Sequence, residues 1–183
     1  ARMTLENEMT KSELSPFAAA VYTPDAAERD ALVRFVAELR AGGVRVGGLL
    51  QEARHGPAGE KAGIDLVEIT SGERFPINRP TKENLASGTC SLDTSVLADS
   101  SAAMRRAIAA RVDLIVLEKF GDQEQKGQGL SEEIFTAIAE EIPLLIAVPE
   151  DALELWRERS GGLGETLDFT LENFRRWWQG VKS

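Results

Sequence analysis

The chain has 183 residues, a length that fits one domain of ordinary size. Hydrophobic residues make up 43% of it and charged residues 28%, which is the balance of a globular protein. The formal net charge of -9 disfavours nucleic acid and anionic membranes as partners, because both would repel the protein. A small anion stays open as a ligand, since a few local N–H groups can hold one.

Cys90 is the single cysteine, so no disulfide can form within the chain, which fits a reducing cytoplasm. No apolar run reaches the roughly 18 residues that a membrane span needs. Residues 1–15 carry no apolar signal core and are predicted to be a disordered lead or a cloning remnant. Residues 16–183 are predicted to form a single α/β domain with a C-terminal helix. Homo-oligomerisation is left open.

The first half of the chain begins with a strand and a helix, for which Asp25 is the expected cap. The Ser71-Gly72 turn later predicts an antiparallel hairpin. The elements expected in this half are a strand at 17–22, a helix at 27–41, a strand at 44–52 and short strands at 65–70 and 73–77.

The second half alternates apolar strands with helices, and its strongest strand pattern is VDLIVL, residues 112–117. Continuous apolar strands separated by helices predict a mainly parallel sheet with helices on both faces, to which the hairpin adds antiparallel strands. The elements expected here are a short strand at 90–92, a helix from Asp93 or Thr94 to about 110, a strand at 112–117, a helix at 131–141, a strand at 143–148 and helices around 153–156 and 171–178.

Ligands of such sheets bind beyond the carboxyl ends of the strands, so the loop after the first strand is a candidate site. A nucleotide-binding P-loop needs GxxxxGK[ST] there, because its glycines wrap the phosphates, its lysine neutralises them and its hydroxyl holds Mg²⁺. This loop has no Gly and no Lys, and it offers Thr23, Asp25 and Glu28 instead. Two carboxylates would repel a triphosphate, and a helix cap with first-turn acids is the alternative interpretation.

The loop after the strongest strand, LEKFGDQEQKGQGL, carries acids that could ligate a cation or orient water. Its Lys119 could contact an anion, and a solvated charged loop is the alternative. Residues 85–95, LASGTCSLDTS, could aim backbone N–H groups at an oxyanion, with Cys90 as a thiolate ligand. A capping turn with a small buried cysteine is the alternative there. His55, the single histidine, is expected on the surface.

Three motifs carry a resemblance to known proteins: GGLLQE at 47–52, GTCSLD at 88–93 and LEKFGDQEQKGQGL at 117–130. Through them, residues 17–165 resemble the small nucleoside triphosphatases first described in thermophiles. They resemble more closely an uncharacterised bacterial family related to those enzymes, whose genes tend to lie beside molybdate ABC transporters. The resemblance implies a P-loop-nucleotidase-like fold, and a link with molybdenum supply through gene neighbourhood. The positions shared with that family are Gln51, Cys90, Leu92, Asp93, Phe120, Gly121, Glu124, Gly129 and Leu130.

The chain departs from the nucleotidase pattern at the residues needed for hydrolysis. The pattern ends its central strand with an Asp-Glu pair, and these positions are Glu118 and Lys119 here. The resemblance therefore leaves Glu118 as a metal ligand, while a cation replaces the carboxylate that activates water. A lysine accepts a proton from water only when it is already neutral. With no Gly or Lys after the first strand either, the P-loop is predicted to be degenerate.

Three hypotheses follow, and absence of enzymatic activity is favoured. The first is a non-hydrolysing binding or accessory protein for a small oxyanion such as molybdate, with no cofactor assigned. The second is a divergent metal-dependent nucleoside triphosphatase using Glu118 and Glu124. The third is an interaction module whose surface could include Trp177 and Trp178, although core packing of the last helix is favoured for that pair.

The first hypothesis assigns a role to each site residue. The anion would be held by backbone and side-chain groups of one loop, from Ser87, Gly88, Thr89 and Cys90. Further donors would come from Gln51 and Lys119. The loops at a shared sheet edge would be ordered by two acids, Asp93 and Glu124, and Gly121 is counted with these ligand-binding residues.

Overall fold

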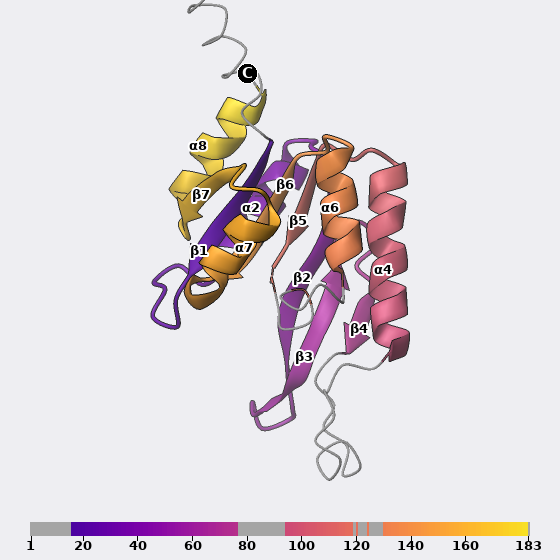
Figure 1. Cartoon of the computed structure of the whole chain (residues 1–183). Helices are drawn as coiled ribbons and strands as arrows, with labels where there is room; N and C mark the ends of the chain where they lie inside the picture. Colours follow the sequence, from indigo (N-terminus) through magenta and orange to yellow (C-terminus); the bar gives the residue numbers. More distant parts are fainter. Residues whose placement is uncertain (1–15, 77–93, 119, 121–123, 125–129, 183) are drawn as a thin grey trace, which may run out of the picture.

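The computed structural model describes residues 16–76, 94–118, 120, 124 and 130–182. The strands in this part of the chain form one sheet in the order β4-β3-β2-β5-β6-β1-β7 (Figure 1). The pairs β2–β5, β5–β6, β6–β1 and β1–β7 are parallel, while β3 runs antiparallel to both of its neighbours, β2 and β4. The strands are β1 Phe17–Tyr22, β2 Val46–His55, β3 Lys61–Glu68, β4 Arg74–Pro76, β5 Leu114–Leu117, β6 Leu144–Pro149 and β7 Glu165–Asp168.

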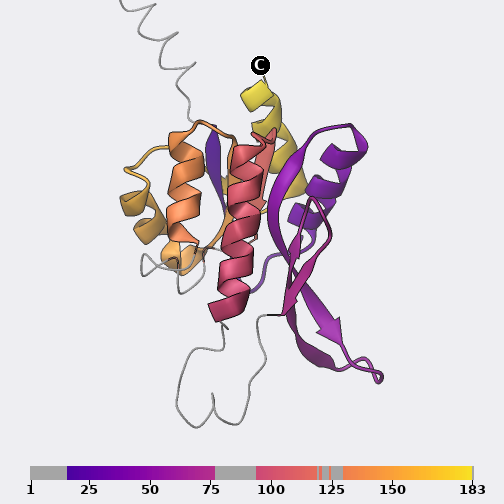
Figure 2. The same ribbon diagram turned by 90° about the vertical axis from the view of Figure 1, so that its right-hand side faces the viewer.

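Helices cover both faces of this sheet (Figure 2). One face packs against α4, α6 and α7, and the opposite face packs against α2 and α8. No helix of the described residues is long and apolar enough to span a bilayer. The helices are α2 Ala31–Ala41, α4 Thr94–Ala109, α6 Ser131–Ala139, the 3-10 turn η1 Glu150–Ala152, α7 Leu153–Arg159 and α8 Leu171–Lys182.

The central strands are apolar along their whole length because both of their faces are buried. In β6, Leu144 and Ile146 enter the core under α4 and α6, while Leu145 and Ala147 enter the core under α2. A strand with period-2 side chains needs apolar residues at every position in such a place. The predicted mainly parallel α/β sheet with an antiparallel extension is therefore confirmed.

Several expected boundaries were wrong. Helix α2 begins at Ala31, not at residue 27, and Asp25 therefore lies in the loop before it and does not cap it. The strand expected at 65–70 begins at Lys61 and also pairs with β2, which makes a second antiparallel pair. Strand β7 was not anticipated. Residues 1–15 and the strand expected at 90–92 lie outside the described residues.

Trp177 and Trp178 lie on the buried side of α8 and pack into the core, each about 5% exposed. Neither indole can be part of an interaction surface in this conformation. The core interpretation of the pair is the one that the structure supports.

Two glycines let β2 approach its neighbours closely. A Cβ on Gly47 would lie 2.8 Å from the Cβ of Ala107 in α4, and a Cβ on Gly48 would lie 2.0 Å from the carbonyl oxygen of Val116 in β5. Gly48 also has φ +112, which side chains rarely adopt. The Gly-Gly pair of the GGLLQE motif is therefore explained by packing of the sheet.

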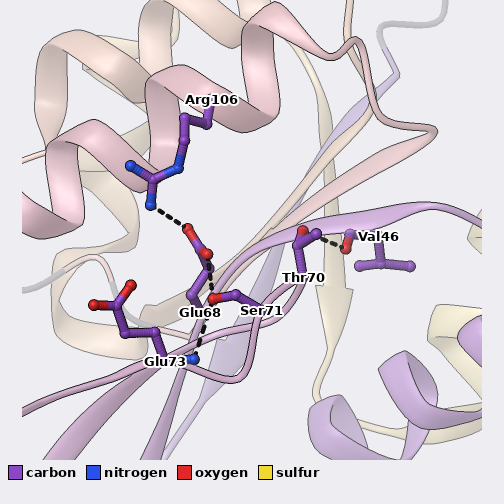
Figure 3. Close-up of polar contacts among 6 residues, drawn as sticks. All are labelled: Val46, Glu68, Thr70, Ser71, Glu73 and Arg106. Atoms are coloured by element: carbon purple, nitrogen blue, oxygen red, sulfur yellow. Dashed lines mark hydrogen bonds and ion pairs between the residues drawn. The ribbon is translucent and has the colours of Figure 1, made fainter.

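Strands β3 and β4 are tied to α4 through a buried carboxylate (Figure 3). Glu68, at the end of β3, accepts a hydrogen bond from Arg106 of α4 at 2.9 Å and another from the hydroxyl of Ser71. The Ser71 hydroxyl in turn accepts the backbone N–H of Glu73 at 3.1 Å. This network fixes the turn between β3 and β4 against the helix.

We expect Gly48→Ala to lower the free energy of unfolding by about 3–5 kcal/mol, because it adds a backbone clash to a strained φ. Gly72→Ala is the matched control, since Gly72 also has positive φ but no atom within 4 Å of an added Cβ. It should cost about 1–2 kcal/mol. Urea denaturation measures both, and equal losses would show that the close approach to Val116 contributes nothing.

Candidate functional site

A pocket of about 510 Å³ opens at the carboxyl ends of the parallel strands. One side of it is formed by the end of β1 and the loop that leads to α2. From this segment the pocket is lined by Tyr22, Thr23, Pro24, Ala26 and Arg29. The loop therefore brings one hydroxyl and one guanidinium to the place where ligands of parallel sheets bind.

The other side of the pocket comes from four further segments of the fold. Gln51 lies in β2, Glu118 directly follows β5, Ala147 lies in β6 and Phe169 follows β7. These residues are far apart in the sequence, and the order of the strands brings them together. The pocket therefore extends across the ends of five neighbouring strands.

Glu118 is a half-buried carboxyl group whose position is fixed by the neighbouring strand. One of its oxygens, Oε2, accepts the backbone N–H of Gln51. Burial raises the pKa of this carboxyl from 4.5 to about 7, because desolvation outweighs the opposing effect of the Gln51 hydrogen bond. At neutral pH the group is therefore close to half protonated, and its protonated form can donate an O–H.

The loop between β1 and α2 folds on itself through local hydrogen bonds. The backbone N–H of Ala26 donates to the carbonyl of Thr23 at 3.1 Å, and the Arg29 guanidinium donates to the carbonyl of Pro24. A guanidinium has five N–H donors, so one such bond orients it and leaves others for a ligand. The loop thus provides an oriented cation at the pocket wall.

Glu28 has a different role from the first-turn acid expected in the sequence. Its Oε1 accepts the backbone N–H of Leu171, the first residue of α8, at 3.4 Å. A carboxylate at a helix N-terminus stabilises that helix. The acid therefore belongs to the junction between the loop and α8, and it is not among the residues that line the pocket.

A neighbouring pocket of about 460 Å³ has the opposite electrostatic character. It shares Tyr22, Thr23 and Pro24 with the first pocket, but its remaining wall includes Glu150 and Asp151. Of the described residues in its lining, two are acids and none is a cation, which disfavours an anion there. An anionic ligand would be better accommodated in the pocket that contains Arg29.

The structure brings together two of the predicted site residues, Gln51 and Glu118. Glu124 does not line that pocket; its Oε2 accepts the backbone N–H of Leu130, just before α6, at 3.0 Å. His55 is exposed, as expected. Within the described ranges no three His, Cys, Asp or Glu side chains gather in a way that could hold a metal ion. The predicted residues outside the described part are Ser87, Gly88, Thr89, Cys90, Asp93, Lys119 and Gly121.

Arg29 and Phe169 are among the pocket residues that the sequence analysis did not identify. Arg29 had a detectable signal, because it is a cation in the loop after the first strand, but it matches neither the Gly nor the Lys of the P-loop motif. Phe169 had no such signal, since it reaches the pocket through β7, a strand that was not predicted. Thr23 was considered in that loop and does line the pocket.

The raised pKa of Glu118 predicts a pH-dependent stability. The folded protein binds this proton more tightly than the unfolded chain, so the free energy of unfolding should fall as pH rises from about 4.5 to about 7. The loss attributable to this group should be about 3 kcal/mol. Glu118→Gln should abolish that part of the slope, and so gain stability relative to the unmodified protein at pH 8.

Glu132→Gln is the control, because Glu132 is exposed in the first turn of α6. Urea denaturation at a series of pH values provides the comparison. If both substitutions leave the same slope as the unmodified protein, the proton on Glu118 does not contribute to stability.

Comparison with solved structures confirms the nucleotidase-like fold. A human cancer-related nucleoside triphosphatase aligns with a TM-score of 0.62 and 18% identity, covering 91% of this chain and 94% of that one. THEP1 from the hyperthermophile Aquifex aeolicus aligns with a TM-score of 0.63 and 14% identity, covering 90% and 96% respectively. At these identities the similarity establishes the fold and nothing about activity.

A curated relative shares more of the sequence. The "Molybdenum import ATP-binding protein ModC 2" of Bradyrhizobium diazoefficiens is 38% identical over 176 residues, which cover 94% of this chain and 19% of the relative. The chain thus spans about a fifth of that protein. The family described as "Protein of unknown function (DUF2478)" matches residues 17–177. That match covers all the strands described above and most of α8, and the chain therefore belongs to the DUF2478 family.

Proposed function

We propose that this protein is a non-hydrolysing accessory protein that binds a small oxyanion, with molybdate as the first candidate. The observation that carries the proposal is the position of Arg29, whose guanidinium is anchored to Pro24 at the wall of a pocket on the carboxyl edge of the sheet. Thr23 adds a hydroxyl donor beside it. The name of the 38% identical relative supports molybdate as the anion to test first.

The carboxyl group of Glu118 is compatible with an anion only in its protonated form. Protonated, it can donate a hydrogen bond to an oxyanion, while its ionised form would repel one. Among the described residues that line this pocket, Glu118 alone carries a carboxyl group. Anion binding should therefore weaken above pH 7, the approximate pKa of Glu118.

Nucleotide hydrolysis is disfavoured by the composition of the same pocket. The loop from Thr23 to Asp30 has no glycine to wrap phosphates and no lysine to neutralise them. The position that would activate water is Lys119 in the aligned motif. The second candidate function, a divergent metal-dependent hydrolase, is supported by Glu118 at the pocket of a nucleotidase-like fold.

Molybdate should raise the melting temperature, while ATP should not. At 100 times its dissociation constant a ligand adds roughly 2.7 kcal/mol, which for a domain of this size corresponds to about 5–10 °C. Differential scanning fluorimetry with molybdate, sulfate and phosphate measures the effect and its selectivity. Arg29→Ala should abolish the shift, whereas Arg40→Ala, an exposed arginine at the other end of α2, should preserve it.

Equal shifts with all three anions would reduce the proposal to nonspecific anion binding. No shift with millimolar molybdate would remove molybdate as the ligand.

ATP and GTP hydrolysis should be negligible in a phosphate-release assay with Mg²⁺. Turnover near 1 s⁻¹ lies within the ordinary range of enzymes and would be readily detected. Such turnover, if lost in Glu118→Gln and retained in Glu132→Gln, would contradict the accessory role and establish the hydrolase instead.

A further inference from the structure

The pocket is much larger than a free oxyanion needs. A tetrahedral oxyanion has five heavy atoms, and at the roughly 30 Å³ that one water occupies in the liquid these would fill about 150 Å³. The pocket measures about 510 Å³. More than two thirds of it would stay vacant around a lone anion, and pockets of this size usually hold organic ligands.

The pocket runs along the sheet edge from β2, past Glu118, to the residue that follows β7. The lining runs from Gln51 in β2 to Phe169 after β7, which are separated by four inter-strand spacings. At about 4.8 Å for each spacing, the two ends are about 19 Å apart. Arg29 and Thr23 belong to the loop after β1, the strand beside β7, so the oxyanion site and Phe169 are neighbours along this edge.

Aromatic side chains form the pocket wall at the β7 end. The ring of Phe169 meets Tyr22 edge-on, with centroids 6.0 Å apart and an interplanar angle of 72°. It also meets Phe174 of α8 at 5.3 Å and 88°, and Phe174 is fully buried. These contacts hold the Phe169 ring in place while it stays half-buried and lines the pocket.

A fixed, partly exposed aromatic ring in the same pocket as an oriented guanidinium suits one chemical class of ligand. Aromatic rings pack favourably on one another with offset or edge-to-face geometry, beyond the gain from apolar burial. We propose that the pocket binds an oxyanion attached to a planar aromatic ring, with the ring against Phe169 and the oxyanion at Thr23 and Arg29. This inference rests on the proposed oxyanion site and adds the organic group of the ligand.

Three simple probes separate the contributions of ring and anion: inorganic phosphate, cyclohexyl phosphate and phenyl phosphate. Isothermal titration calorimetry on the full chain gives the affinity of each, with molybdate as a fourth titration. Phenyl phosphate should bind about tenfold more tightly than inorganic phosphate, and more tightly than cyclohexyl phosphate, which has a similar size but no planar ring. Phe169→Leu should remove the preference for phenyl over cyclohexyl phosphate.

Phe135→Leu is the matched control, because Phe135 is also half-buried but packs on the opposite face of the sheet, stacked against Trp156. It should leave the preference for phenyl phosphate unchanged. Arg29→Ala should weaken binding of all the phosphates.

The outcomes distinguish this inference from the function on which it rests. If molybdate or inorganic phosphate binds and phenyl phosphate binds no better, the aromatic ligand is ruled out and the oxyanion site stands. If phenyl phosphate binds in a Phe169-dependent manner and molybdate does not bind, the inference holds and molybdate is excluded. If none of the four probes binds, both proposals fail.

Discussion

Burial of β1, β5 and β6 on both faces is the constraint on which the rest of the structure depends. These strands carry apolar residues at successive positions and lie between two helical layers. Their polar neighbours can therefore lie only beyond the strand ends. Because β1, β5 and β6 run in the same direction, Thr23 and Glu118 emerge at one edge of the sheet, where they line the same pocket.

The fold determines the chemical properties of Glu118, on which the proposed binding depends. Its carboxyl is held by the Gln51 backbone in a half-buried place, and desolvation raises its pKa to about 7. A carboxylate that helped to bind Mg²⁺ would work best when ionised, whereas one that binds an oxyanion would work best when protonated. The proposal of an oxyanion also draws on Arg29, a cation that lines the same pocket.

The sequence predicted the elements whose signals are local. The runs FAAAVY and PLLIAV, at 17–22 and 143–148, are apolar at every position, and β1 and β6 are found within one residue of them. Strand β7 was missed because its sequence ETLD is short and polar, with alternately half-buried and exposed side chains. Its position beside β1 depends on tertiary pairing that no local pattern reveals.

The site could be predicted only in part for the same reason. Gln51 and Glu118 were identified from motifs, and the structure brings both to one pocket. Phe169 joins them through the order of strands in the sheet, which pairs β7 with β1 and places the following residue at the pocket. Arg29 matches neither the Gly nor the Lys of the P-loop motif, although its guanidinium also carries a positive charge that an anion can bind.

The most direct test of the proposed oxyanion site is a crystal structure of the protein crystallised with molybdate. Diffraction data would be collected at the molybdenum absorption edge. An anomalous peak should lie in the pocket with its oxygens about 3 Å from the Arg29 guanidinium and the Thr23 hydroxyl. A peak elsewhere on the chain, or no peak at saturating molybdate, would contradict the proposal that this pocket binds the oxyanion.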